Sequence, residues 1–293
     1  MKFRRYTDVD MYKADVLDIL LEDEVRNNIP IGILVDGKRD NVIDWLMATV
    51  LDDNGKVLLI ALCTMPFRML LYETAVEPGD DMQNDPVEFL ANELKRIKFS
   101  PPGVLATDNL AGRFADAYCG GDGGTDGIIR SRHHMTMILM KLDKLTAYNK
   151  APGFCRMLNE NDLSYTPSWE NAFCVDCRVP VYTLAESENR IKTRLGMNIH
   201  YIWEDGQPVA QAVFGRNTPN GAAISWVYTP PEFRGRGYAT SVVAELSKAI
   251  LNGGKSFCCL FADAANPASC SVYRKLGYYD VCSFDEIMFD TMG

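Results

Sequence analysis

The segment from residue 222 to residue 251 places the strongest constraint on the fold. Residues 222–229 (AAISWVYT) are mostly apolar and predict a strand. A bend rich in Pro, Gly and Arg follows at residues 230–236. Apolar side chains then recur at helical spacing over residues 237–251, which predicts an amphipathic helix. A buried strand that turns directly into a helix is typical of an α/β domain.

The bend between this strand and this helix has the properties of an anion site. The first turn of a helix holds backbone N–H groups without intrahelical partners, and they lie at the positive end of the helix dipole. Gly235 and Gly237 leave room for a phosphate beside the backbone, and Arg234 and Arg236 add positive charge. The alternative is a solvated basic turn that simply begins a helix.

The C-terminal half has the element order β-β-β-α-β-α-β. Its strands are expected at residues 199–204, 208–214, 222–229, 257–262 and about 281–289, and its helices at 237–251 and 266–276. The apolar run at 257–262 follows a helix, so we predict a buried parallel strand there.

The N-terminal half repeats much of this order. Its elements are expected at residues 45–51, 56–63, 68–74, 86–97, 104–107, 110–119 and 135–142. Matching points such as Gly55 and Gly206, or Asn109 and Asn266, lie 151 and 157 residues apart. We therefore predict two copies of one domain, at residues 1–148 and 154–293, although two α/β patterns can also align by chance. Helices at 9–27, 161–177 and 183–195 introduce the two halves.

Residues 155–290 resemble the GNAT superfamily of acyl-CoA-dependent N-acyltransferases. The family motif Arg/Gln-x-x-Gly-x-Gly/Ala is filled by Arg234, Gly237 and Ala239. A second family block matches residues 266–278 (NPASCSVYRKLGY). The resemblance implies an α/β fold with a mixed sheet, acetyl-CoA as cosubstrate, and direct acetyl transfer to an amine of unknown identity within a ternary complex.

The resemblance also implies the cofactor-binding residues. The diphosphate would lie on the backbone of the glycine loop, and the pantetheine arm would follow the preceding strand. A backbone N–H near Val227 or Tyr228 would polarise the thioester carbonyl. The full set is Val227, Tyr228, Thr229, Arg234, Gly235, Arg236, Gly237, Tyr238, Ala239, Thr240, Asn266, Ser269 and Tyr273.

The short helix after residue 266 supplies the candidate general acid. Asn266, Ser269 and Tyr273 are three and four residues apart and share one helical face. Tyr273 would protonate the departing CoA thiolate. The alternatives are a surface tyrosine at position 273 and a simple helix N-cap at Asn266.

The general base is less well defined, because the strand AAISWVYT carries no carboxylate. Glu232, beside the loop, and Glu170, on a helix expected to cover the substrate side, are the main candidates, with Asp176 a third. A water relay, or an amine that arrives neutral, needs no dedicated base. A non-catalytic acyl-CoA sensor therefore remains the alternative function.

The N-terminal copy lacks the glycine loop. The corresponding segment, residues 74–86 (TAVEPGDDMQNDP), is acidic and would repel a diphosphate. Asp116 stands where the repeat would place Tyr273. We therefore expect that this copy does not bind CoA and instead packs against the second, walling the substrate cleft.

Charge and hydropathy exclude several partners. The chain has 30 Lys and Arg against 39 Asp and Glu, a net charge of -9, and neither half is basic. Nucleic-acid binding is therefore not expected, whereas an acidic field favours a cationic amine substrate. The apolar run at residues 57–63 is too short to cross a bilayer, so no membrane association is expected.

The cysteines point to a reducing compartment. Nine cysteines without an export signal at the N-terminus indicate reduced thiols and a cytoplasmic protein. Separately, we expect the protein to be a monomer or a homodimer. Cys174 and Cys177 form one CxxC pair, but a structural zinc site needs four ligands, so no metal is expected.

Overall fold

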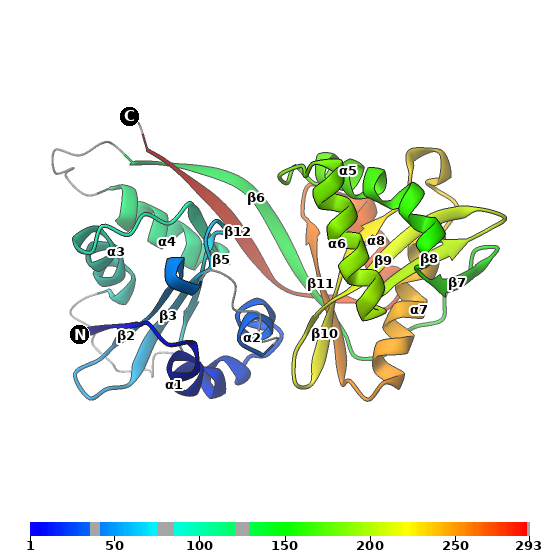
Figure 1. Cartoon of the computed structure of the whole chain (residues 1–293). Coiled ribbons are helices and arrows are strands. Elements are labelled where there is room, and N and C mark those ends of the chain that lie inside the picture. The colour runs from blue at the N-terminus through cyan, green and yellow to red at the C-terminus, as the bar shows by residue number, and fades with distance from the viewer. Residues whose placement is uncertain (36–41, 75–84, 121–128, 292–293) are drawn as a thin grey trace. The chain divides into compact units, whose positions relative to one another are not determined.

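The computed structural model describes residues 1–35, 42–74, 85–120 and 129–291. The chain divides into two compact units (Figure 1). The first unit is Met1–Ile138 together with Cys282–Gly293, and the second is Leu139–Val281.

The first unit is a mixed sheet covered by helices. Its strands lie in the order β1-β2-β3-β4-β5-β12, and all neighbours are antiparallel except β4 and β5. Its elements are β1 (Lys2–Tyr6), α1 (Val9–Leu21), α2 (Asn28–Val35), β2 (Leu46–Leu51), β3 (Val57–Cys63), β4 (Met69–Glu73), α3 (Pro86–Arg96), β5 (Gly103–Thr107) and α4 (Asp108–Cys119). Strand β6 (Ile129–Leu142) begins in this unit and ends in the second.

Apolar side chains lie on both faces of the central strands of the first unit and form two apolar cores. On β2, Leu46, Ala48 and Val50 face a cluster that includes Leu90 of α3 and Phe114 of α4. Met47 of β2, with Ile60 and Leu62 of β3, joins the other cluster, which contains Tyr12 and Leu20 of α1. Successive side chains of a strand point to opposite faces, so α3 and α4 cover one face of the sheet and α1 and α2 the other (Figure 1).

The second unit is built on the strand order β11-β10-β9-β8-β7. Its elements are β7 (Phe154–Met157), the 3-10 helix η2 (Glu160–Ser164), α5 (Thr166–Asp176), α6 (Leu184–Met197), β8 (His200–Glu204), β9 (Pro208–Asn217), β10 (Gly221–Tyr228), the 3-10 helix η3 (Pro231–Phe233), α7 (Tyr238–Asn252), β11 (Phe257–Asp263) and α8 (Pro267–Lys275). Neighbouring strands are antiparallel except β10 and β11, which are parallel.

Helices α5 and α6 of the second unit lie in front of its strands in Figure 1. Helix α6 begins with a capping box in which Thr183 and Glu186 satisfy each other's backbone N–H groups. Ile191 of α6 packs against Ile202 of β8. On α5, the ring of Trp169 contacts Tyr228 of β10. The ring of Phe173, also on α5, contacts Trp226 of β10.

The structure confirms the predicted element order in both halves and the parallel strand at 257–262. Among the described residues, five elements were not predicted: β1, α2, β7 and the 3-10 helices η1 (Val42–Asp44) and η3. The helix expected at 9–27 ends at Leu21, and that expected at 161–177 divides into η2 and α5. The acidic segment at 74–86 lies mostly outside the described residues.

The last strand differs from the predicted domain organisation. Strand β12 (Tyr279–Thr291) pairs with β5, and residues 282–293 belong to the first unit, whereas β6 neighbours β11. The compact units therefore divide the chain at other points than the predicted domains of 1–148 and 154–293, whose boundaries stay a prediction.

His200 should make stability depend on pH. The side chain is buried on β8, its Nε2 lies 3.2 Å from Gln211 Oε1, and burial lowers its pKa to about 4. The unfolded chain therefore binds a proton more readily, and stability should fall as the pH drops from about 6.5 towards about 4. His200→Asn should flatten this dependence in urea titrations, by at most about 3 kcal/mol.

His133→Asn, which changes an exposed histidine, is the matched control and should keep the wild-type dependence. An unchanged pH dependence in His200→Asn would contradict the assignment.

Candidate functional site

The parallel strands β10 and β11 pair only at their amino ends. Their described pairing covers Gly221 to Ala223 and Phe257 to Cys259. Both strands continue beyond this point, β10 to Tyr228 and β11 to Asp263. The later residues of each strand therefore have backbone groups that the other strand does not pair.

A bulge in β10 accompanies this opening. The register against β9 shifts between Ser225 and Tyr228, so Trp226 and Val227 have no partner residue in the described ladder. Trp226 has φ of 54°, in the left-handed region that a bulky residue rarely adopts. A bulge bends its strand and increases the local twist, and strained backbone of this kind clusters at functional sites.

The loop after β10 presents the start of α7. Gly235 and Gly237 have φ of 78° and 82°, which glycine adopts without strain. Gly237 is the N-cap residue, and no side chain caps the helix. A Cβ at Gly235 would meet nothing within 4 Å. The loop is therefore open beside Gly235, and no side chain caps the first-turn N–H groups of α7, two features that suit an anion site.

The two arginines of the loop hold its shape. Arg234 donates from Nε to the carbonyl of Thr229, at 2.9 Å, and pairs with Asp176 at 2.6 Å. Arg236 donates to the carbonyl of Glu232 at 3.2 Å. Both side chains are exposed, so their positive charges lie at the surface of the loop.

The remaining predicted cofactor residues lie along β10 and the first turn of α7. Tyr238 is buried and donates to Asp205 at 2.6 Å, whereas Ala239 and Thr240 are half-buried. Thr229, at the end of β10, carries a buried Oγ1 without a hydrogen-bond partner. A buried hydroxyl without a partner is unusual, so Thr229 is suited to bind a ligand.

The α8 residues divide between structural and chemical roles. Asn266 is the N-cap of α8 and accepts from the backbone N–H of Ser269 at 3.1 Å, as the capping alternative predicted. Tyr273 is buried rather than on the surface, and its ring lies edge-on to Tyr278 at 6.0 Å. Burial raises the pKa of Tyr273 to about 12, so the hydroxyl keeps its proton at neutral pH.

Glu170 on α5 is buried and fully engaged. Its Oε1 accepts from Arg190 at 2.7 Å and from Arg194 at 3.1 Å, and its Oε2 accepts from Arg194 at 3.2 Å. The carboxylate is 1% exposed. Both carboxylate oxygens are therefore occupied by guanidinium donors.

Glu232 lies in η3 and is exposed. Its backbone carbonyl accepts a hydrogen bond from Arg236, and its side chain is exposed to solvent. Asp176, at the end of α5, is occupied by Arg234, and the next ion pair joins Arg178 to Asp263 at 2.8 Å. Helix α5 therefore ends against both the loop after β10 and the end of β11.

Sequence reasoning missed three features of this site. The backbone conformation of Trp226 is one, because no sequence pattern marks its left-handed φ. Arg190 and Arg194 are the others; their guanidinium carbons lie 5.3 and 4.6 Å from the Trp226 ring centre. Their spacing of four residues on one helix face was a usable signal.

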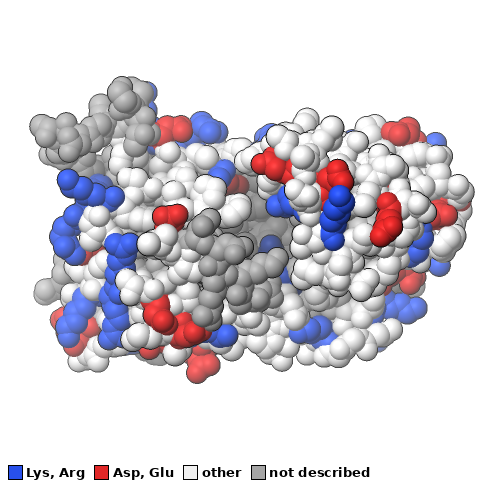
Figure 2. All heavy atoms as spheres, in the orientation of Figure 1, with Lys and Arg blue, Asp and Glu red and all other residues white. Residues whose placement is uncertain are grey.

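Among the described residues, no three His, Cys, Asp or Glu side chains gather as a metal site would require. All nine cysteines are free thiols, Cys174 and Cys177 included. The described helices include none that is long and apolar enough to cross a membrane. On the face of the second unit drawn in Figure 2, acidic and basic side chains are interspersed.

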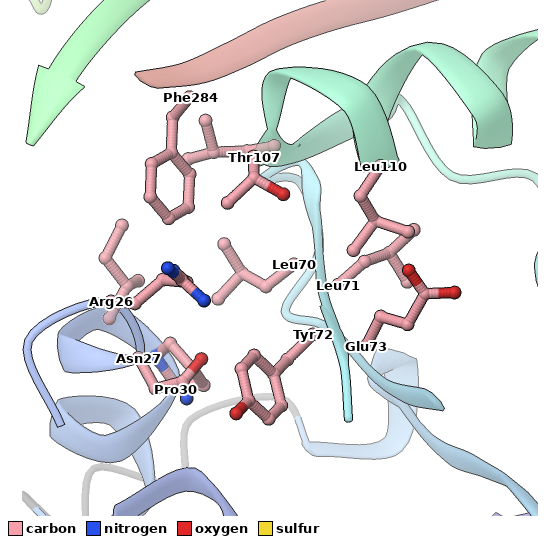
Figure 3. Close-up of a pocket in the computed structure, with 12 residues that line it drawn as sticks. Arg26, Asn27, Pro30, Leu70, Leu71, Tyr72, Glu73, Thr107, Leu110 and Phe284 are labelled. Carbon is pink, nitrogen blue, oxygen red and sulfur yellow. The ribbon is translucent and has the colours of Figure 1, made fainter. Parts of the chain in front are cut away.

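The first unit contains a cavity of about 170 Å³ where its own parallel strands, β4 and β5, meet (Figure 3). Arg26, Tyr72, Glu73 and Thr107 contribute polar atoms, and Leu70 is among the apolar residues of the wall. Glu73 is paired with Arg113 at 2.8 Å. Asp116 lies on α4 outside this lining, and whether this unit binds CoA stays a prediction.

Residues 206–284 match the family model described as FR47-like protein. A GNAT-family acetyltransferase from Colwellia psychrerythraea superposes with a TM-score of 0.60 at 10% identity, covering 100% of both chains. A GCN5-related N-acetyltransferase from Sphaerobacter thermophilus gives 0.64 at 15% identity, covering 99% of this chain and 95% of the other. The fold is that of GNAT acetyltransferases.

A tandem GNAT protein from the clavulanic acid biosynthesis pathway is also similar, with a TM-score of 0.58 at 14% identity over 100% of this chain and 98% of the other. The resemblance to GNAT proteins and the mixed α/β fold in two tandem copies are therefore confirmed. No curated protein sequence matches the chain significantly.

The buried ion-pair cluster gives a stability prediction. Glu170→Ala leaves two guanidinium groups, one of them on the buried Arg194, without their carboxylate. The free energy of unfolding should fall by about 3 kcal/mol or more. Chemical denaturation measures the change.

Glu232→Ala removes an exposed carboxylate and is the matched control, with a change within about 0.5 kcal/mol. Equal effects of the two substitutions would show that the Glu170 cluster does not stabilise the unit.

Proposed function

We propose that the second unit transfers the acetyl group of acetyl-CoA to an amine by direct attack within a ternary complex. The observation that carries this proposal is the opening between β10 and β11 beside the uncapped, glycine-bearing start of α7. A strand with unpaired backbone groups suits an amide-bearing arm, and a helix N-terminus suits a diphosphate. CoA contains both groups in sequence.

The residues present fit this cosubstrate. Gly235, Gly237 and the backbone of Tyr238 to Thr240 would hold the diphosphate, with Arg234 and Arg236 adding charge. The pantetheine would follow Val227 to Thr229, where the Thr229 hydroxyl lacks a partner. A backbone N–H at Val227 or Tyr228 would stabilise the oxyanion.

The reaction forms a C–N bond and breaks a C–S bond. The amine nitrogen attacks the thioester carbonyl, the tetrahedral intermediate collapses, and the sulfur leaves as a thiolate that takes a proton. Tyr273 is the proposed donor, because its hydroxyl keeps its proton at neutral pH. The amine gives its own proton to solvent or to a base.

The contacts of the two candidate bases separate their roles. Glu170 is held by two arginines, so we assign it a positioning role rather than proton transfer. Glu232 remains the candidate carboxylate, and an amine that arrives neutral needs neither.

A non-catalytic acyl-CoA sensor is the second candidate function. One observation favours it: β10 from Gly221 to Tyr228 carries no carboxylate beside the cleft. CoA release in the presence of amines distinguishes the two functions.

Acetyl-CoA should raise the melting temperature of the protein. A ligand at 100 times its Kd stabilises the native state by about 2.7 kcal/mol. Gly235→Asp places a carboxylate in the loop before α7. Its charge should repel the diphosphate and weaken acetyl-CoA binding about tenfold or more. Calorimetric titration measures the affinity.

Gly235→Asn is the matched control, because Asn has nearly the same shape, also tolerates positive φ, and carries no charge. An open space at this position lets both variants fold. Equal affinity of the Asp and Asn variants would place the diphosphate elsewhere.

Tyr273→Phe should lower kcat by about 100-fold, the lower range for a positioned acid, and leave the acetyl-CoA affinity nearly unchanged. Tyr278→Phe, a buried neighbour whose hydroxyl bonds Ser247 at 2.8 Å, is the control and should keep kcat. A Tyr273→Phe enzyme with full turnover would refute the acid assignment.

A further inference from the structure

Arg190 on α6 is held as a rigid cation beside the bulge of β10. Its Nε donates to the buried Glu170 at 2.7 Å. Its guanidinium carbon lies 4.2 Å from the ring centre of Tyr182 and 5.3 Å from that of Trp226. Two aromatic rings and one buried carboxylate thus fix the plane of the guanidinium before any ligand arrives.

The cluster around Glu170 carries an excess of positive charge. One carboxylate faces two guanidinium groups. Arg190 donates to Glu170 from Nε, and Arg194 donates to the same carboxylate from both terminal nitrogens. Arg194 is buried, whereas the side chain of Arg190 is 37% exposed. The uncompensated charge is therefore presented by Arg190, in a chain whose net charge is -9.

The terminal nitrogens of Arg190 are available to a ligand. The recorded hydrogen bond of this side chain uses Nε. A guanidinium that uses Nε for its buried partner keeps two terminal NH₂ groups, and such groups can bind a carboxylate with two parallel hydrogen bonds.

The position of Arg190 relates this cation to the reaction. Trp226, the ring it stacks on, directly precedes Val227, where we place the thioester. Helices α5 and α6 supply the residues around Trp226, with the Phe173 ring of α5 at 4.8 Å. Arg190 therefore lies beside the residue that precedes the proposed thioester position.

We propose that Arg190 binds a carboxylate on the acceptor, so that the substrate is an amine that also carries a carboxylate, as amino acids do. This inference rests on the proposed acetyl transfer. Glu170 acts as the positioning residue that fixes the guanidinium. The net negative charge of the chain favours a cationic amine. Arg190 supplies the local positive charge that would bind the carboxylate of an amino acid.

The test uses acceptors that differ in one charge. Glycine, β-alanine and 4-aminobutyrate are compared with their carboxamides in an acetyl-CoA-dependent CoA-release assay. We expect at least one acid to be preferred over its amide by about tenfold or more in kcat/KM, the range for a hydrogen-bonded ion pair.

Arg190→Gln should remove this preference by raising KM for the acid about tenfold or more, with little change for the amide or for acetyl-CoA. Arg190→Lys keeps the positive charge but cannot donate two parallel hydrogen bonds. It should therefore retain part of the preference for the acid that Arg190→Gln loses. Lys192→Gln, which removes a cation from the same helix where it pairs with Glu188, is the matched control and should behave as wild type.

The outcomes separate the two proposals. Equal turnover of acids and amides, or an acid preference that survives in Arg190→Gln, overturns the role of Arg190 while acetyl transfer stands. Silence with every acceptor, despite acetyl-CoA binding, overturns both and favours the sensor.

Discussion

The divergence of two parallel strands, β10 and β11, is the constraint on which the second unit depends. Parallel strands normally satisfy each other along their full length, and here the described ladder ends after three residue pairs. Trp226 holds a left-handed backbone conformation at the bulge where β10 leaves its regular register with β9. Aromatic and cationic side chains of α5 and α6 contact this residue, so the bulge is held by the packing around Trp226.

Local features of the site could be predicted from the sequence. The glycine loop, the start of α7 and the Asn266 cap each depend on residues within one turn of one another, so spacing alone predicts them. The bulge could not be predicted, because its φ is imposed by packing rather than by the identity of Trp226. The ion pairs of Glu170 could not be predicted either, because its arginine partners lie 20 and 24 residues away in the sequence.

The same distinction applies to the fold. Apolar alternation predicts strands such as β2 and β3 but does not specify their neighbours, which depend on long-range pairing. Strand β12 illustrates this limit: its sequence predicts a strand, and its pairing with β5 puts residues 282–293 in the first unit. Strands β1 and β7, the two not predicted, are short and lie at the ends of the strand order.

Hydrogen–deuterium exchange with and without acetyl-CoA tests the central claim most directly. Backbone amides from Val227 to Thr229 and from Gly235 to Thr240 lie at the strand opening and the helix start, so they should gain protection together when the ligand is added. Unchanged exchange in both segments at saturating acetyl-CoA, or protection confined to the first unit, would contradict the account.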